Sequence, residues 1–113
     1  MVHLLVVAPS PTFRNSLRFA LEAEGYDVTT AGSMHEVDQP GSSFDCTVLD
    51  HHALDYAGIE SHRILAEFEP VVFLANSPAH PLASLSFRTL TKPTLGPALS
   101  DAVRSAIAAR TAT

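Results

Sequence analysis

The densest group of chemically active side chains in the sequence is Asp50-His51-His52, with Asp55 shortly after it. Imidazole and carboxylate together suit Zn²⁺ and other transition metals. Consecutive residues that leave a strand point to different sides, however, so these three side chains could meet at one ion only if a tight turn followed Asp50. We therefore expect polar loop residues beside a site, and no metal ligand set.

Asp50 lies at a position where α/β folds with parallel sheets commonly have their functional residues. It ends a short, mostly β-favouring run, residues 44–50, which predicts a strand buried on both faces and therefore a parallel sheet. Open parallel sheets bind ligands and react at the carboxyl ends of their strands. The sequence thus predicts a functional carboxylate at Asp50.

The rest of the chain supplies the elements that must position this carboxylate. Ser10 and Pro11 favour the start of a helix, with Phe13, Leu17, Ala20 and Leu21 as its core-facing stripe and Gly25 as its end. Further strands are expected at 3–7, 26–31, 70–75 and 87–91, and further helices at 34–39, 58–67 and 97–109.

Five strands that alternate with helices predict an α/β protein, a three-layer α/β/α sandwich around a parallel sheet. The flavodoxin-like strand order 2-1-3-4-5 is the natural one at this length. Pro78 and Pro81 leave room for only a short or degenerate fourth helix. We expect one domain over residues 1–110, followed by a tail at 111–113.

The composition excludes several classes of protein. Seven basic residues stand against twelve acidic ones, a net charge of −5, which argues against a nucleic-acid surface. No apolar run is long enough to span a membrane, and Met1-Val2-His3 lacks the charged start of a signal peptide, so we expect a cytoplasmic protein. The one cysteine, Cys46, is expected to be a small buried side chain.

Several short motifs occur in an order that is typical of one family. They are the opening segment Leu4–Arg14, the helix-to-strand segment Leu21–Val28, Val48-Leu49-Asp50, Gly58, and Thr91-Lys92-Pro93. Together they resemble a response-regulator receiver domain over nearly the whole chain, which implies its CheY-like fold.

The resemblance gives Asp50 and Lys92 roles. Asp50 matches the phosphoacceptor, and Lys92, the only lysine in the chain, matches the lysine that contacts the acceptor carboxylate. Ser10 is expected to line the same site. The family also implies a cis bond between Lys92 and Pro93.

Other positions depart from the family. Its acidic Mg²⁺-binding pair falls on Ala8 and Pro9. Its hydroxyl position falls on Ala75, where Asn76 or Ser77 could substitute only if the loop shifts. The aromatic position that signals the switch is Thr89. We therefore expect no Mg²⁺, no cofactor and no catalytic residue in a chain that is not an enzyme. The pattern is that of an atypical or pseudo-receiver.

Three functions are compatible with these residues. The first is a phosphorylation-independent interaction module of bacterial two-component signalling, whose partner would be a histidine kinase or a regulator. The second is a non-standard receiver still phosphorylated on Asp50, natural as it stands or cut from a hybrid kinase or a longer regulator. The third is a metal- or small-ligand-binding flavodoxin-like domain. We expect no nucleic-acid or membrane partner, and self-association through the face of the fourth helix, fifth strand and fifth helix.

Overall fold

The computed structural model describes residues 2–54, 59–77, 83–92 and 97–111 of the chain. Its centre is a parallel sheet whose five strands lie in the order β2-β1-β3-β4-β5, which confirms the predicted order. The strands are β1 (His3–Val7), β2 (Asp27–Ala31), β3 (Cys46–Asp50), β4 (Val71–Ala75) and β5 (Arg88–Thr91). The central strands β3 and β4 are buried along their whole length, as their continuous apolar sequences predict.

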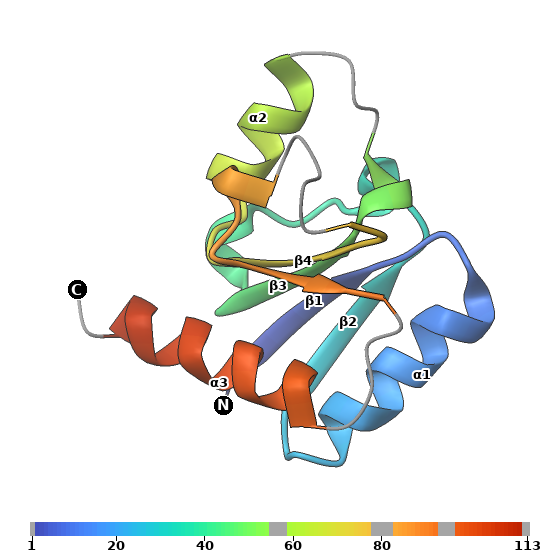
Figure 1. Cartoon of the computed structure of the whole chain (residues 1–113), viewed down its shortest axis with the longest axis vertical. Coiled ribbons are helices and arrows are strands. Elements are labelled where there is room, and N and C mark those ends of the chain that lie inside the picture. Colours follow the sequence, from blue (N-terminus) through green and yellow to red (C-terminus); the bar gives the residue numbers. More distant parts are fainter. Residues whose placement is uncertain (1, 55–58, 78–82, 93–96, 112–113) are drawn as a thin grey trace.

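Helices cover both faces of the sheet (Figure 1). Helices α1 (Pro11–Glu22) and α3 (Pro97–Thr111) lie on one face, and α2 (Ile59–Glu67) lies on the other. Two clusters of buried side chains fill the spaces between the layers. One joins β1, β3 and β4 to Leu17 and Leu21 of α1 and to Leu99 and Val103 of α3. The other joins the sheet to Leu65 and to Phe68, just past α2, so the predicted three-layer sandwich is confirmed.

The local signals for α1 act as predicted, with one exception. Ser10 caps the helix by accepting a hydrogen bond from the Phe13 amide at 3.4 Å, Pro11 occupies its first turn, and Gly25 takes the left-handed conformation beyond its end (φ +94°). Ala20, however, was expected to face the core and is exposed. The inward stripe follows the four-residue spacing of Phe13, Leu17 and Leu21, and Ala20 lies at its margin.

The helix predicted at 34–39 is wrong: only one 3₁₀ turn forms there, η1 (Met34–Glu36). Val37 is already extended, and Pro40 disfavours helical geometry at the residue before it. A cavity of about 510 Å³, lined among others by Val37, Ile64 and Phe68, lies between this segment and α2. Within the described ranges, that face of the sheet is therefore covered by one α-helix and the other face by two.

The ends of the remaining elements differ little from the prediction. Helix α3 continues to Thr111, two residues beyond the expected end and into the segment expected to be a tail. Ala83–Leu85 form a single 3₁₀ turn, η4, which is all of the reduced fourth helix that the described residues contain. Within the described ranges, no helix combines the length and the apolar character needed to cross a bilayer.

Gly41 is required by a contact that the sequence does not reveal. It begins the 3₁₀ turn η2 (Gly41–Ser43), and a Cβ atom there would lie 2.1 Å from the carbonyl oxygen of Glu67 at the end of α2. We expect Gly41→Ala to lower the free energy of unfolding by about 1–3 kcal/mol, because backbone must shift to admit the methyl group. Ser42→Ala, one residue on and exposed, is the matched control and should change stability by less than about 0.5 kcal/mol. Equal urea midpoints for the two variants would contradict the close contact.

Cys46 is buried in β3, as expected, and burial raises the pKa of its thiol from 9.0 to about 12. The unfolded chain therefore ionises at a lower pH than the folded one. The stability due to the neutral thiol is complete below about pH 9 and is lost as the pH rises towards 12, by about 1.4 kcal/mol per pH unit. Urea unfolding between pH 8 and roughly 11 should show this loss in the native chain but not in Cys46→Ala. If the free energy of unfolding has the same pH dependence in the native chain and in Cys46→Ala, the buried thiol does not contribute in this way.

Candidate functional site

Asp50 is the last residue of β3, the middle strand of the sheet, and it is only 2% exposed. Its neighbours in the sheet are β1 and β4, so the carboxylate lies at the carboxyl edge between the ends of two other strands. This is the position at which open parallel sheets place ligands and reacting groups.

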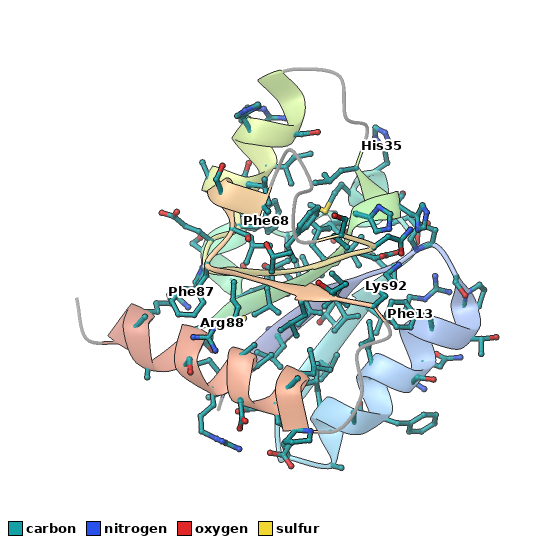
Figure 2. All side chains as sticks on the ribbon, in the orientation of Figure 1. Phe13, His35, Phe68, Phe87, Arg88 and Lys92 are labelled. Atoms are coloured by element: carbon teal, nitrogen blue, oxygen red, sulfur yellow. The ribbon has the colours of Figure 1, made fainter. Side chains whose placement is uncertain are left out.

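Lys92 follows β5 directly, and its amide donates a hydrogen bond of 2.8 Å to the carbonyl of Ala75 at the end of β4. Its Nζ contacts Oδ1 of Asp50, as expected from the sequence. The ammonium also lies 5.0 Å from the centre of the Phe13 ring at the start of α1, within cation–π range. Figure 2 shows Lys92 and Phe13 close to one another near the carboxyl ends of the strands. The only lysine of the chain thus neutralises the buried carboxylate.

The two histidines after Asp50 also lie beside it. A 3₁₀ turn, η3 (His51–Ala53), starts at once and is closed by a hydrogen bond of 3.2 Å from the Leu54 amide to the His51 carbonyl. Nδ1 of His52 lies 3.5 Å from Oδ2 of Asp50, and the two imidazole rings lie 3.9 Å apart. The tight turn on which the convergence of these three side chains depended is therefore present, and one donor atom from each residue lies within 4.8 Å of the other two.

A cavity of about 320 Å³ opens above Asp50. It is lined by Pro9, Ser10, Phe13, Asp50, His52 and Lys92. Ser10 and Pro9 were expected at the site and line this cavity, whereas Phe13 was expected only as a core residue. The position of Phe13 could have been inferred, because it lies three residues after a helix N-cap and hence at the same edge as the strand ends.

The positions that depart from the receiver pattern carry no ligand side chain. Ala8 is fully buried in the core cluster between the sheet and α1, and Pro9 is exposed. Arg14 donates hydrogen bonds to the carbonyls of Ala8 (2.9 Å) and Pro9 (3.5 Å), which ties down the loop between β1 and α1.

The other substituted position lies at the end of β4. Ala75 is fully buried there, and Asn76 is exposed. Neither residue is among those that line the cavity above Asp50 in the described part of the chain. Asp55, Gly58 and Pro93, and with Pro93 the geometry of the Lys92–Pro93 bond, lie outside the described residues.

Comparison with known proteins identifies the fold. No family model and no curated protein matches the sequence. Among solved structures, the chain is similar to a response regulator receiver domain protein from Clostridium thermocellum, at 23% identity and a TM-score of 0.73 over 99% of this chain and 98% of that one.

Two further receiver structures have the same fold. One is the non-phosphorylated HemR receiver domain from Leptospira biflexa, at 21% identity and a TM-score of 0.76 over 95% of this chain and 94% of that one. The other is the beryllofluoride-activated NtrC4 receiver domain dimer, at 22% identity and a TM-score of 0.75 over 97% of this chain and 99% of that one. The chain therefore has the CheY-like fold of response-regulator receiver domains.

Proposed function

We propose that this chain is an atypical receiver domain of two-component signalling, which acts mainly as a phosphorylation-independent docking module for a histidine kinase or a regulator. The observation that carries the proposal is the direct contact of Lys92 with Asp50, beside a β1–α1 loop that supplies no carboxylate. The phosphoacceptor position is kept, while the residues that would hold a hard cation next to it are replaced by Ala8 and Pro9.

Phosphoryl transfer depends on that cation. Mg²⁺ bridges the phosphoryl oxygens and neutralises the charge that develops on them. It gives up its water reluctantly and needs one or two carboxylates together with phosphate oxygens. Asp50 offers a single carboxylate, and one of its oxygens is already in contact with an ammonium. A docking function requires no phosphoryl transfer. The outer faces of the helices and the ends of the strands can provide the surface that a partner protein contacts.

The test is incubation with acetyl phosphate, with and without Mg²⁺, followed by intact-mass measurement of the protein. We expect no Mg²⁺-dependent phosphorylated species, and Asp50→Asn provides the background level. Mg²⁺-dependent labelling of the native chain that disappears in Asp50→Asn would overturn the proposal in favour of a working receiver.

A working, non-standard receiver is the second candidate. It is favoured by the cavity of about 320 Å³ above Asp50, because an open space beside the carboxylate and Lys92 is what an incoming phosphoryl group requires. In this function Lys92 would take over part of the charge neutralisation that a metal provides. Acetyl phosphate labelling that does not depend on Mg²⁺ but requires Lys92 would support it.

Self-association is a further part of the proposal, through the face formed by η4, β5 and α3. Phe87, next to the edge strand β5, is 40% exposed on this face and has Arg88 beside its ring, as Figure 2 shows. Leu82 and the side chain of Leu85 lie outside the described residues. We expect light scattering to report a dimer at high micromolar concentration that is weakened in Phe87→Ser. A monomer under these conditions would contradict the expected contact.

A further inference from the structure

We propose that Asp50, His51 and His52 form a binding site for a divalent transition metal such as Zn²⁺. The ligands would be Oδ2 of Asp50, Nδ1 of His52 and one ring nitrogen of His51, and water or a group from a partner would complete the coordination. This site does not depend on the docking function, since it concerns only what these three side chains bind.

The distances between the donor atoms fit such an ion. Zn²⁺ binds nitrogen and oxygen at about 2.0–2.1 Å, so two ligands of a tetrahedral site lie about 3.3 Å apart. The observed separation between Oδ2 of Asp50 and Nδ1 of His52 is 3.5 Å. One donor atom from each of the three residues lies within 4.8 Å of the other two. Asp50 and His52 therefore have nearly the spacing of two ligands of one ion, and a rotation of side chains would have to bring the third donor atom, on His51, to the same ion.

The surroundings hold two ligands in place and leave the third accessible. Asp50 and His51 are buried, at 2% and 5% exposure, so packing limits the positions they can take. The side chain of His52 is 59% exposed and lines the cavity above Asp50. An ion can enter through this cavity, and a fourth ligand can reach it from the same side. Three protein ligands with one open position are the arrangement of zinc sites that bind an exchangeable group.

Lys92 need not be displaced for the metal to bind. Its Nζ contacts Oδ1 of Asp50, whereas His52 lies next to Oδ2. The carboxylate can therefore bind the ion through one oxygen and keep the ammonium on the other, as ligating carboxylates commonly keep an outer partner. The positive charge of Lys92 will oppose the ion, which limits the affinity of the site.

The donor set selects the kind of metal. Two imidazole nitrogens and one carboxylate oxygen suit Zn²⁺, Co²⁺, Ni²⁺ or Cu²⁺. Mg²⁺ requires oxygen ligands in octahedral geometry and gains little from imidazole. The site is therefore expected to bind Zn²⁺ in the presence of a large excess of Mg²⁺.

The test is a calorimetric titration of the whole chain with ZnCl₂, together with a titration with CoCl₂ followed by visible absorption. We expect one Zn²⁺ per chain, and cobalt bands typical of nitrogen and oxygen ligands. His52→Ala should weaken Zn²⁺ binding by about 100-fold or more, since even the loss of an outer partner of a ligand costs 10–100-fold. Because His52 is exposed, this variant should keep the native circular dichroism spectrum. Asp50→Asn should weaken binding in the same way.

His62→Ala is the matched control, because His62 is an exposed histidine on α2 outside the cluster. It should leave the affinity for Zn²⁺ unchanged. The proposal is overturned if the native chain binds no Zn²⁺, if His52→Ala binds it as tightly as the native chain, or if His62→Ala removes the binding. None of these results bears on acetyl phosphate labelling, so the proposed function and this inference can fail separately.

Discussion

Lys92→Met should lower the free energy of unfolding by about 3 kcal/mol, because it leaves the buried carboxylate of Asp50 without its cation. Removing one partner of a buried ion pair typically costs 3–5 kcal/mol, and the partial exposure of the Lys92 side chain places this pair at the lower end. For a domain of this size, the loss corresponds to a fall in Tm of the order of 10–20 °C. Urea unfolding followed by circular dichroism at pH 7 measures it.

Two further variants make this prediction specific. Arg104→Met removes an exposed cation whose ion pairs with Asp101 and Glu24 lie on the surface, and it should cost less than about 1 kcal/mol. The double variant Asp50→Asn/Lys92→Met removes both charges and should recover most of the lost stability, since no uncompensated charge stays buried. If Lys92→Met is no more harmful than Arg104→Met, the ion pair does not support the fold.

The second large expected effect is the creation of a Mg²⁺ site beside Asp50 by a single substitution. Restoring the acidic pair of the receiver pattern would require substitutions at both Ala8 and Pro9. Ala8, however, is fully buried among apolar side chains, where a carboxylate would be costly. Pro9 is exposed and lines the cavity that contains Asp50. Pro9→Asp should therefore place a second carboxylate beside Asp50 and create a Mg²⁺ site of about millimolar affinity.

Calorimetry or chemical-shift changes on addition of MgCl₂ would measure the new site. Pro9→Asn is the matched control, because it releases the same backbone constraint and adds a side chain of the same size without the charge. The native chain and this control should both bind Mg²⁺ far more weakly than Pro9→Asp. If the native chain binds Mg²⁺ as tightly as Pro9→Asp, the replacement of the acidic pair by Ala8 and Pro9 has not weakened Mg²⁺ binding, and the prediction is wrong.

Most of the fold could be predicted from local signals in the sequence. Apolar runs and the Ser10-Pro11 and Gly25 signals act over a few residues, and the strand order follows from alternation and chain length. The contact between Lys92 and Asp50 was implied by the resemblance to receiver domains. The fold allows it because Asp50 ends β3 and Lys92 directly follows β5, at the same edge of the parallel sheet.

What the sequence did not reveal depends on contacts between distant segments or on the geometry of single turns. Gly41 is required by the backbone of Glu67, which lies far from it in the chain. The convergence of His51 and His52 on Asp50 depends on a single 3₁₀ turn after β3. The sequence of this turn contains no glycine or proline that would have predicted it. The failure of the helix at 34–39 reflects the competition between a weak helical pattern and Pro40.

The single lysine has a consequence for chemistry performed on the protein. Among the side chains only Lys92 carries a primary amine, and that amine is held as an ammonium against Asp50 and over the ring of Phe13. A reagent that acylates amines reacts with the neutral amine, so Lys92 must lose its proton and leave its contact with Asp50 before it can react. Each molecule acylated at a side-chain amine has therefore lost the charge that neutralises its buried carboxylate. Acylation of Lys92, enzymatic or chemical, thus modifies this side chain and removes its ion pair with Asp50 in one event.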